Sequence, residues 1–173
     1  MTTVSKAPPT SHLFAGPIAT FIDQALSNEI AQTLQENFVH VVGHAPSPSE
    51  VKSWNVSLKD LAYLLRDAKL PDVQVLLEYR LPVSGKRIDA LLAGVDQSGQ
   101  ARAVVVELKQ WDKAEVTDIE NTVSLYGGKT GELHPHPSEQ AATYAELLSG
   151  WHTAFHAEDA VAVEACAFLH SRS

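Results

Sequence analysis

Three short β-rich runs, separated by short turns, constrain the fold of this chain more than any other feature of its sequence. They are residues 73–81, 87–94 and 102–109, and aliphatic and β-branched side chains dominate them. The segments between them carry the turn residues Ser and Gly. Because connections this short can join only antiparallel neighbours, the pattern predicts a three-stranded meander.

Helical periodicity appears on both sides of this meander. From Ser27, a candidate N-cap, apolar residues recur at helical spacing as far as Gly43, and a second helical stretch begins after Ser49. Downstream, Pro137 opens another helix, and residues 161–169 have the composition of a buried strand. The predicted order is ααβββαβ, an α/β fold with a mixed sheet and flanking helices.

The length of 173 residues suits one domain, which we expect to span residues 27–173. Residues 1–26 contain several Ser, Thr, Pro and Gly residues, so we expect a loosely ordered lead-in. Residues 111–136 are polar and show no strong period. We expect a long functional loop or a partly ordered excursion there.

The distribution of apolar residues and cysteine predicts a cellular compartment. The apolar run 13–22 is interrupted by Gly16 and Pro17, so we expect neither a secretory signal nor a membrane-spanning segment. The single cysteine, Cys166, fits a reducing environment. We therefore expect a cytoplasmic protein that does not associate with membranes.

The net charge of −8 weighs against a nucleic-acid partner, because proteins that bind nucleic acid usually carry a basic surface. The sequence contains 21 acidic and 13 basic residues and no basic arm. Carboxylates that hold divalent cations would account for part of this excess, since a bound metal inverts the local charge.

Asp89 and Glu107 lie at matching positions of the second and third predicted strands. The turn between these strands, DQSGQ, is centred on Ser98, so a simple hairpin places Asp89 opposite Glu107 on one face. Lys109, two residues further, points to the same side. Two like charges so placed repel, and a hard divalent cation such as Mg²⁺ offsets that repulsion. The competing interpretation is an ordinary salt-bridged strand end.

At these residues the sequence resembles the PD-(D/E)XK nuclease superfamily, whose pattern is a helix acid, a strand Asp and a Glu-x-Lys. Five strings, in order, also resemble the N-terminal nuclease-like region of bacterial Schlafen-group DNA/RNA helicase proteins: EVKSWNVSL, EYRLPVSGKRIDALLAG, VVVELKQWDKAE, HPHPSEQAATYAELL and ACAFLH. The resemblance covers roughly residues 27–170. It implies a restriction-endonuclease-like fold and hydrolysis of phosphodiester bonds, above all in DNA, with Mg²⁺ or Mn²⁺.

The resemblance also implies roles for individual residues. Asp89 and Glu107 match the metal-binding positions, and Lys109 matches the catalytic lysine. The helix acid is Glu36, with Glu29 as the alternative, and for either residue a solvated helix face is an equal alternative.

Further residues are assigned with alternatives. Depending on whether the following turn, VSG, is tight or open, either Glu78 or Arg80 faces Asp89, and Glu78 joins the metal site if it is the one that does. Gln140 resembles the Gln that many members place beside the lysine, or it caps a helix. His136 and Arg87 can contact phosphate, although a surface salt bridge is an equal alternative for Arg87.

Two other expectations concern partners. The helicase relatives continue beyond ACAFLH into a motor domain, so a helicase or another protein is an expected partner in nucleic-acid processing or phage defence. The alternative function is a catalytically inactive, nuclease-like module that binds nucleic acid or protein. A purely structural α/β domain is a third alternative.

Overall fold

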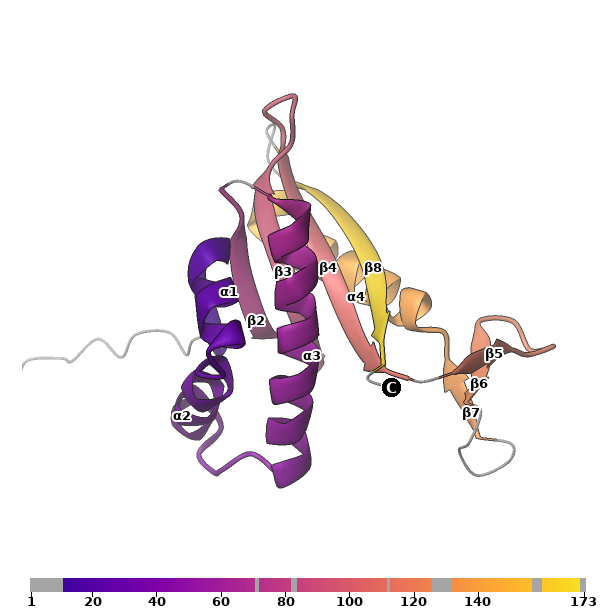
Figure 1. Cartoon of the computed structure of the whole chain (residues 1–173). Coiled ribbons are helices and arrows are strands. Elements are labelled where there is room, and N and C mark those ends of the chain that lie inside the picture. The colour runs from indigo at the N-terminus through magenta and orange to yellow at the C-terminus, as the bar shows by residue number, and fades with distance from the viewer. Residues whose placement is uncertain are drawn as a thin grey trace, which may run out of the picture.

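The computed structural model describes residues 11–70, 72–81, 84–111, 113–125, 132–156 and 160–171. A five-stranded sheet with the order β1-β2-β3-β4-β8 forms its centre (Figure 1). The strands of this sheet are β1 (Phe14–Pro17), β2 (Gln74–Arg80), β3 (Arg87–Val95), β4 (Ala101–Gln110) and β8 (Ala162–His170). The pairs from β1 to β4 are antiparallel, and β8 joins β4 in parallel. The predicted meander and mixed sheet are confirmed.

Helices cover both faces of this sheet. They are α1 (Ile18–Leu26), α2 (Ile30–Val42), α3 (Pro48–Ala68) and α4 (Pro137–Trp151). Side chains of α1, α2 and α3 share one buried apolar cluster with the sheet, and those of α4 share a second. The sheet is therefore the middle layer of a helix–sheet–helix arrangement (Figure 1).

The expectation that residues 1–26 form a loosely ordered lead-in is partly wrong. Residues 1–10 lie outside the described part of the chain, but residues 14–26 form β1 and α1. Ile18, Phe21 and Ala25 follow helical spacing and are buried, with Phe21 fully inaccessible to solvent. Pro17 does not break this helix, because it lies at the N-cap, before the first helical residue.

Local signals set the ends of the next two helices. Ser27 is the C-cap of α1 rather than the start of α2, while Gly43, at φ +88°, ends α2 as expected. The helix α3 begins earlier than the candidate cap Ser49 because Ser47 forms a reciprocal capping box with Glu50. This cap fixes the position of Glu50 in the first turn of α3.

A second, smaller sheet replaces the long loop expected between β4 and α4. Its strands are β5 (Ala114–Val116), β6 (Thr122–Leu125) and β7 (Leu133–Pro135), paired antiparallel in that order. This β5–β7 sheet stands apart from the main sheet, beside the end of β4 (Figure 1). A short 3₁₀ helix, Thr153–Phe155, follows α4.

The helices also bear on the expectation about membranes. Within the described ranges, no helix has the length and apolar character required to cross a bilayer.

Candidate active site

The register of β3 and β4 places Asp89 opposite Glu107. Ala90 pairs with Val106 at the end of the described ladder, and one further step of the same register brings the two acids together. Beyond Val106 the ladder is interrupted, because a carboxylate oxygen of Asp89 accepts the backbone N–H of Leu108 at 2.9 Å. The hairpin register expected from the turn at Ser98 is therefore present in the structure.

A third carboxylate, that of Glu78, extends this row onto β2. The pairs Leu77–Ala90 and Tyr79–Ile88 flank it, so Glu78, and not Arg80, lies opposite Asp89. One carboxylate from each of three adjacent strands therefore lies at the same level of the sheet.

The backbone is unusual at this row. Glu78 has φ +55°, a left-handed conformation that costs an L-residue roughly 1–2 kcal/mol. Leu77 and Ala90 pack in the cluster beneath α1, α2 and α3, whereas Tyr79 and Ile88 pack in the cluster beneath α4. Residues two apart on a regular strand would share one face. On both strands the side chains thus switch from one face of the sheet to the other at the row. This switch allows Glu78 to turn toward α3.

The carboxylates line a cavity of about 170 Å³ between α3 and the sheet. Its lining is mixed, with several charged side chains beside apolar surface, and comes from α3 and the three central strands. The lining residues are Glu50, Ser53, Trp54, Ser57, Leu58, Glu78, Arg87, Asp89, Glu107, Leu108 and Lys109. The three strand acids are joined there by a fourth from α3.

Glu107 lies at the centre of a short network. One of its carboxylate oxygens, Oε1, receives Lys109 Nζ at 2.7 Å and Gln140 Nε2 at 2.6 Å. Gln140 also contacts the hydroxyl of Tyr144 at 2.9 Å. Gln140 therefore fixes the carboxylate of Glu107 from α4, on the opposite face from α3. The other oxygen, Oε2, is buried with no hydrogen-bond partner among the described residues.

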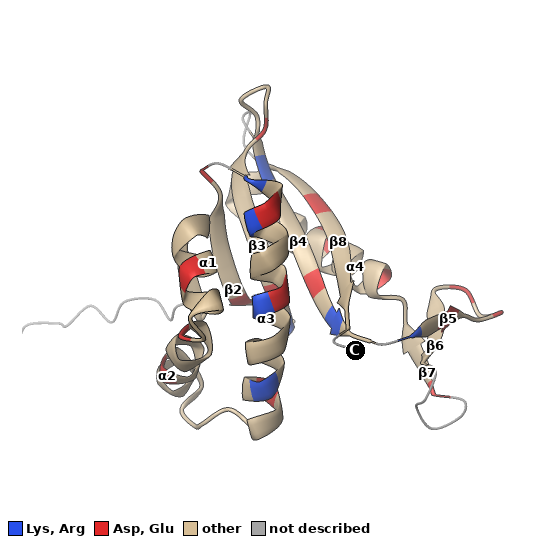
Figure 2. Ribbon diagram, in the orientation of Figure 1, with Lys and Arg blue, Asp and Glu red and all other residues tan. Residues whose placement is uncertain are grey.

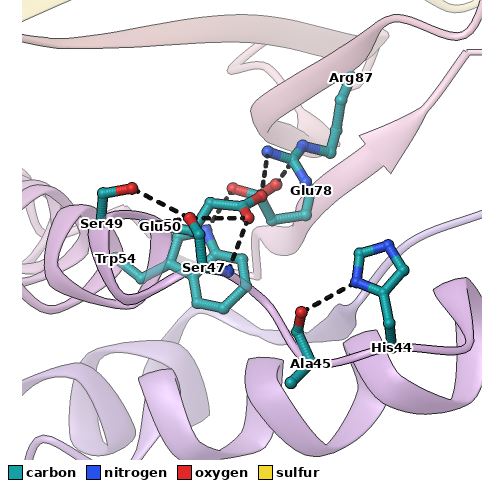
Figure 3. A network of polar contacts seen from close by, with 8 residues as sticks. All are labelled: His44, Ala45, Ser47, Ser49, Glu50, Trp54, Glu78 and Arg87. Atoms are coloured by element: carbon teal, nitrogen blue, oxygen red, sulfur yellow. Dashed lines mark hydrogen bonds and ion pairs between the residues drawn. The ribbon is translucent and has the colours of Figure 1, made fainter.

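A second network joins α3 to β2 and β3 (Figure 3). Trp54 Nε1 donates to Glu78 Oε1 at 2.7 Å. The guanidinium of Arg87 binds Glu78 Oε2 through Nε at 2.5 Å and Glu50 Oε1 through Nη2 at 3.0 Å. Arg87 is thus a half-buried bridge between two site carboxylates, so the ion-pair alternative for this residue is present in the structure. A phosphate contact of Arg87 stays a prediction.

Burial perturbs the acids of the row. It raises the pKa of Glu78 to about 7, against the lowering influence of the Arg87 charge. Burial and the negative charge of Asp89 raise the pKa of Glu107 to about 7, although Lys109 opposes this. Burial likewise raises the pKa of Asp89, and the N–H of Leu108 opposes the rise. Near neutral pH this row holds protons that solvent-exposed carboxylates would have lost.

Glu50 behaves differently from the strand acids. Burial acts to raise its pKa, but the hydrogen bond and charge of Arg87 and the bonds from Ser47 together lower it. The carboxylate on α3 therefore stays ionised where the row is partly protonated. The cavity combines an ionised acid, perturbed acids and two cations, a composition common in functional sites.

The helix acid chosen from the sequence is wrong. Glu36 lies on the exposed face of α2, where it accepts a hydrogen bond from Gln32, and Glu29 is also exposed. Neither residue lines the cavity, whereas Glu50 does. A signal for Glu50 exists in the sequence, because Glu50, Trp54 and Ser57 recur at helical spacing on one stripe of α3. Both Trp54 and Ser57 are buried.

His136 is likewise placed by the fold in a structural position. It is the N-cap of α4, and its ring Nδ1 accepts the N–H of Ser138 at 3.2 Å. It does not line the cavity. The structure thus brings Asp89, Glu107, Lys109, Glu78 and Arg87 into one cavity, with Gln140 bound to its rim.

The carboxylates of the cavity are oxygen ligands of the kind that divalent cations prefer. Across the described ranges, no group of three or more His, Cys, Asp or Glu side chains is arranged to hold a metal ion. Mg²⁺ is commonly held by one or two carboxylates, with water and substrate phosphate completing its shell. Asp89 and Glu107 would supply two such carboxylates, and Oε2 of buried Glu107 has no hydrogen-bond partner among the described residues.

Comparisons with protein-family models, with curated proteins and with solved structures found no match for this chain.

Proposed function

We propose that this chain is a divalent-metal-dependent deoxyribonuclease domain that hydrolyses phosphodiester bonds in DNA. The observation that carries the proposal is the row of three carboxylates, Glu78, Asp89 and Glu107, in one cavity with Lys109. The resemblance to the PD-(D/E)XK pattern at Asp89, Glu107 and Lys109 agrees with this chemistry.

Asp89 and Glu107 are the residues that would hold Mg²⁺ or Mn²⁺. Both belong to adjacent strands, and a buried oxygen of Glu107 has no partner among the described residues. An unsatisfied buried carboxylate oxygen is costly, and a cation would satisfy it. When bound, a divalent cation supplies Lewis-acid stabilisation of phosphoryl oxygens.

The remaining residues bind, orient or carry charge. Lys109 holds an ammonium beside the row, where it stabilises negative charge that develops on a phosphate. Gln140 keeps the Glu107 carboxylate aligned from the α4 side. Arg87 holds Glu78 and Glu50 together, so that both carboxylates keep fixed positions in the wall of the cavity.

A second candidate function is a nuclease-like module that binds without cutting. The observation that favours it is that cations of the protein already neutralise the site: Lys109 binds Glu107, and Arg87 binds Glu78 and Glu50. The two candidates differ in metal binding, because the module requires none.

The test is a cleavage panel on linear, nicked and single-stranded DNA with Mg²⁺ or Mn²⁺. We expect Lys109→Ala and Asp89→Ala to abolish cleavage while their thermal unfolding stays cooperative. Lys52→Ala, an exposed lysine on α3, is the matched control and should cleave like the wild type. Wild-type cleavage by Lys109→Ala would refute the proposal.

Calorimetry separates the nuclease from the binding module. The nuclease requires Mn²⁺ binding by the wild type and its loss in Asp89→Ala. No metal binding and no cleavage of any substrate would favour the module.

A further inference from the structure

The β5–β7 sheet is tied to the candidate site at both of its ends. It leaves the main sheet directly after Lys109 and Gln110 of β4, and it returns to α4 just before Gln140. Lys109 and Gln140 both contact Glu107. The β5–β7 sheet therefore begins and ends next to residues of the site, and Figure 1 shows it beside the end of β4.

An aromatic pair lies at the base of this projection. Trp111 follows Lys109 by two residues, and the Lys109 ammonium lies 5.9 Å from the centre of the Trp111 ring. The ring of His134, on β7, lies 5.9 Å from that of Trp111 and is tilted by 52°. Both residues are half-buried, so each packs against neighbours and is still partly accessible to solvent.

The charges around this pair decide what it can bind. Among the described residues between Trp111 and His134, four exposed side chains are acidic, Glu115, Asp118, Glu120 and Glu132, and one, Lys113, is basic. Glu132 Oε1 lies 4.0 Å from His134 Nε2. Figure 2 shows basic and acidic residues interleaved along α3 and β4 rather than separated into a basic face. The acidic side chains of the β5–β7 sheet therefore disfavour repeated phosphate contacts of the kind that give nucleic-acid proteins their affinity, and Lys109 is left to contact the phosphate beside the carboxylate row. An uncharged base stacked on an aromatic ring is not penalised in this way.

We propose that Trp111, supported by His134, is a stacking platform for an unpaired base next to the scissile phosphate. Lys109 contacts both the Trp111 ring and Glu107, so a base on this platform places its own phosphate beside the carboxylate row. A paired base hides its faces in the duplex. The preferred substrate is therefore single-stranded or frayed DNA, an inference that rests on the proposed nuclease function.

Binding is tested first, without cleavage. The anisotropy of a fluorescein-labelled oligothymidylate is measured with the protein in Ca²⁺, for the wild type, Trp111→Ala, Trp111→Phe and Trp151→Ala. We expect Trp111→Ala to weaken binding about tenfold, the order of loss seen on removing one stacking contact. Trp111→Phe should keep most of the affinity. Trp151, which is exposed at the end of α4, is the matched control and should have no effect. Equal binding by the wild type and Trp111→Ala, or equal losses in the Ala and Phe variants, would overturn the platform.

Cleavage then separates stacking from a mere positioning of Lys109. The substrates are single-stranded DNAs that each carry one abasic residue, at a different position in each. The rate at which the protein cleaves each of them with Mn²⁺ is measured. At one position, we expect the abasic residue to lower the cleavage rate of the wild type as much as Trp111→Ala lowers the rate on the intact DNA. Combining Trp111→Ala with that abasic DNA should lower the rate no further. An equal slowing of every strand by Trp111→Ala would make Trp111 only a positioning residue and would overturn the platform.

The two proposals fail in different ways. If the wild type cuts DNA but the Trp111 variants behave like it in both assays, the platform is wrong and the nuclease stands. If the oligonucleotide binds through Trp111 but no strand is cut, the nuclease is wrong and the stacking stands. If the wild type neither binds nor cuts, both are wrong.

Discussion

Replacing Glu78 with Gln should flatten the dependence of stability on pH. Burial raises the pKa of Glu78 from its ordinary value of 4.5 to about 7. The folded chain therefore keeps the proton on this carboxyl at pH values where the unfolded chain has lost it. The stabilising contribution is complete below pH 4.5 and is lost as the pH rises through about 7.

The magnitude follows from the size of this change. The difference between about 7 and 4.5 corresponds to about 3 kcal/mol, at about 1.4 kcal/mol for each pKa unit. Because the side chain of Glu78 is only 6% exposed, solvent screening reduces this value little. Between about pH 5 and 8, Glu78 alone should lower the free energy of unfolding by about 2–3 kcal/mol.

Urea unfolding followed by circular dichroism at pH 5 and pH 8 measures this change. Glu78→Gln should lose less stability than the wild type over this range, by roughly 1 M in the urea midpoint at a typical urea dependence. Glu107 still titrates in this variant, so part of the wild-type dependence remains. Glu36→Gln, on the exposed face of α2, is the matched control and should follow the wild type. Parallel pH profiles for Glu78→Gln and the wild type would refute the reasoning.

Two further predictions test how the fold supports the site. Phe21→Ala should lower the free energy of unfolding in urea by about 3–5 kcal/mol, because Phe21 is fully buried. Val39→Ala, on the exposed face of α2, is the control and should change this free energy little. A small effect of Phe21→Ala would place α1 outside the core. Ser47→Ala should cost about 1 kcal/mol through loss of the α3 cap, whereas the neighbouring Ser49→Ala should cost less. An equal effect of the two Ser variants on the thermal midpoint would contradict the cap assignment.

Features that depend on neighbouring residues could be predicted from the sequence. The turn at Ser98 specifies the β3–β4 register, and the observed pairing of Ala90 with Val106 follows it. The same applies to Gly43, which ends α2, and to Pro137, which opens α4. Short turns and caps act over a few residues, so their signals are visible in the chain without its tertiary packing.

Other features of the candidate site could not be read in this way. The choice between Glu78 and Arg80 depended on the left-handed backbone of Glu78 inside β2, which no local sequence pattern predicts. Helical spacing groups Glu50 with Trp54 and Ser57, but the choice of Glu50 over Glu36 depended on which helix crosses the cavity and which of its faces meets the sheet. Both decisions depend on contacts between residues distant in the chain.

The sequence by itself determined the strand meander, the placement of Asp89 opposite Glu107 and the position of Lys109, because strand alternation and a short turn dictate them. Only the tertiary structure decided that Glu78, Glu50, Arg87 and Gln140 converge on that pair. It also showed that β1 and α1 belong to the core. The physical reason is that helix docking and burial of side chains are properties of the packed layers and not of any single segment.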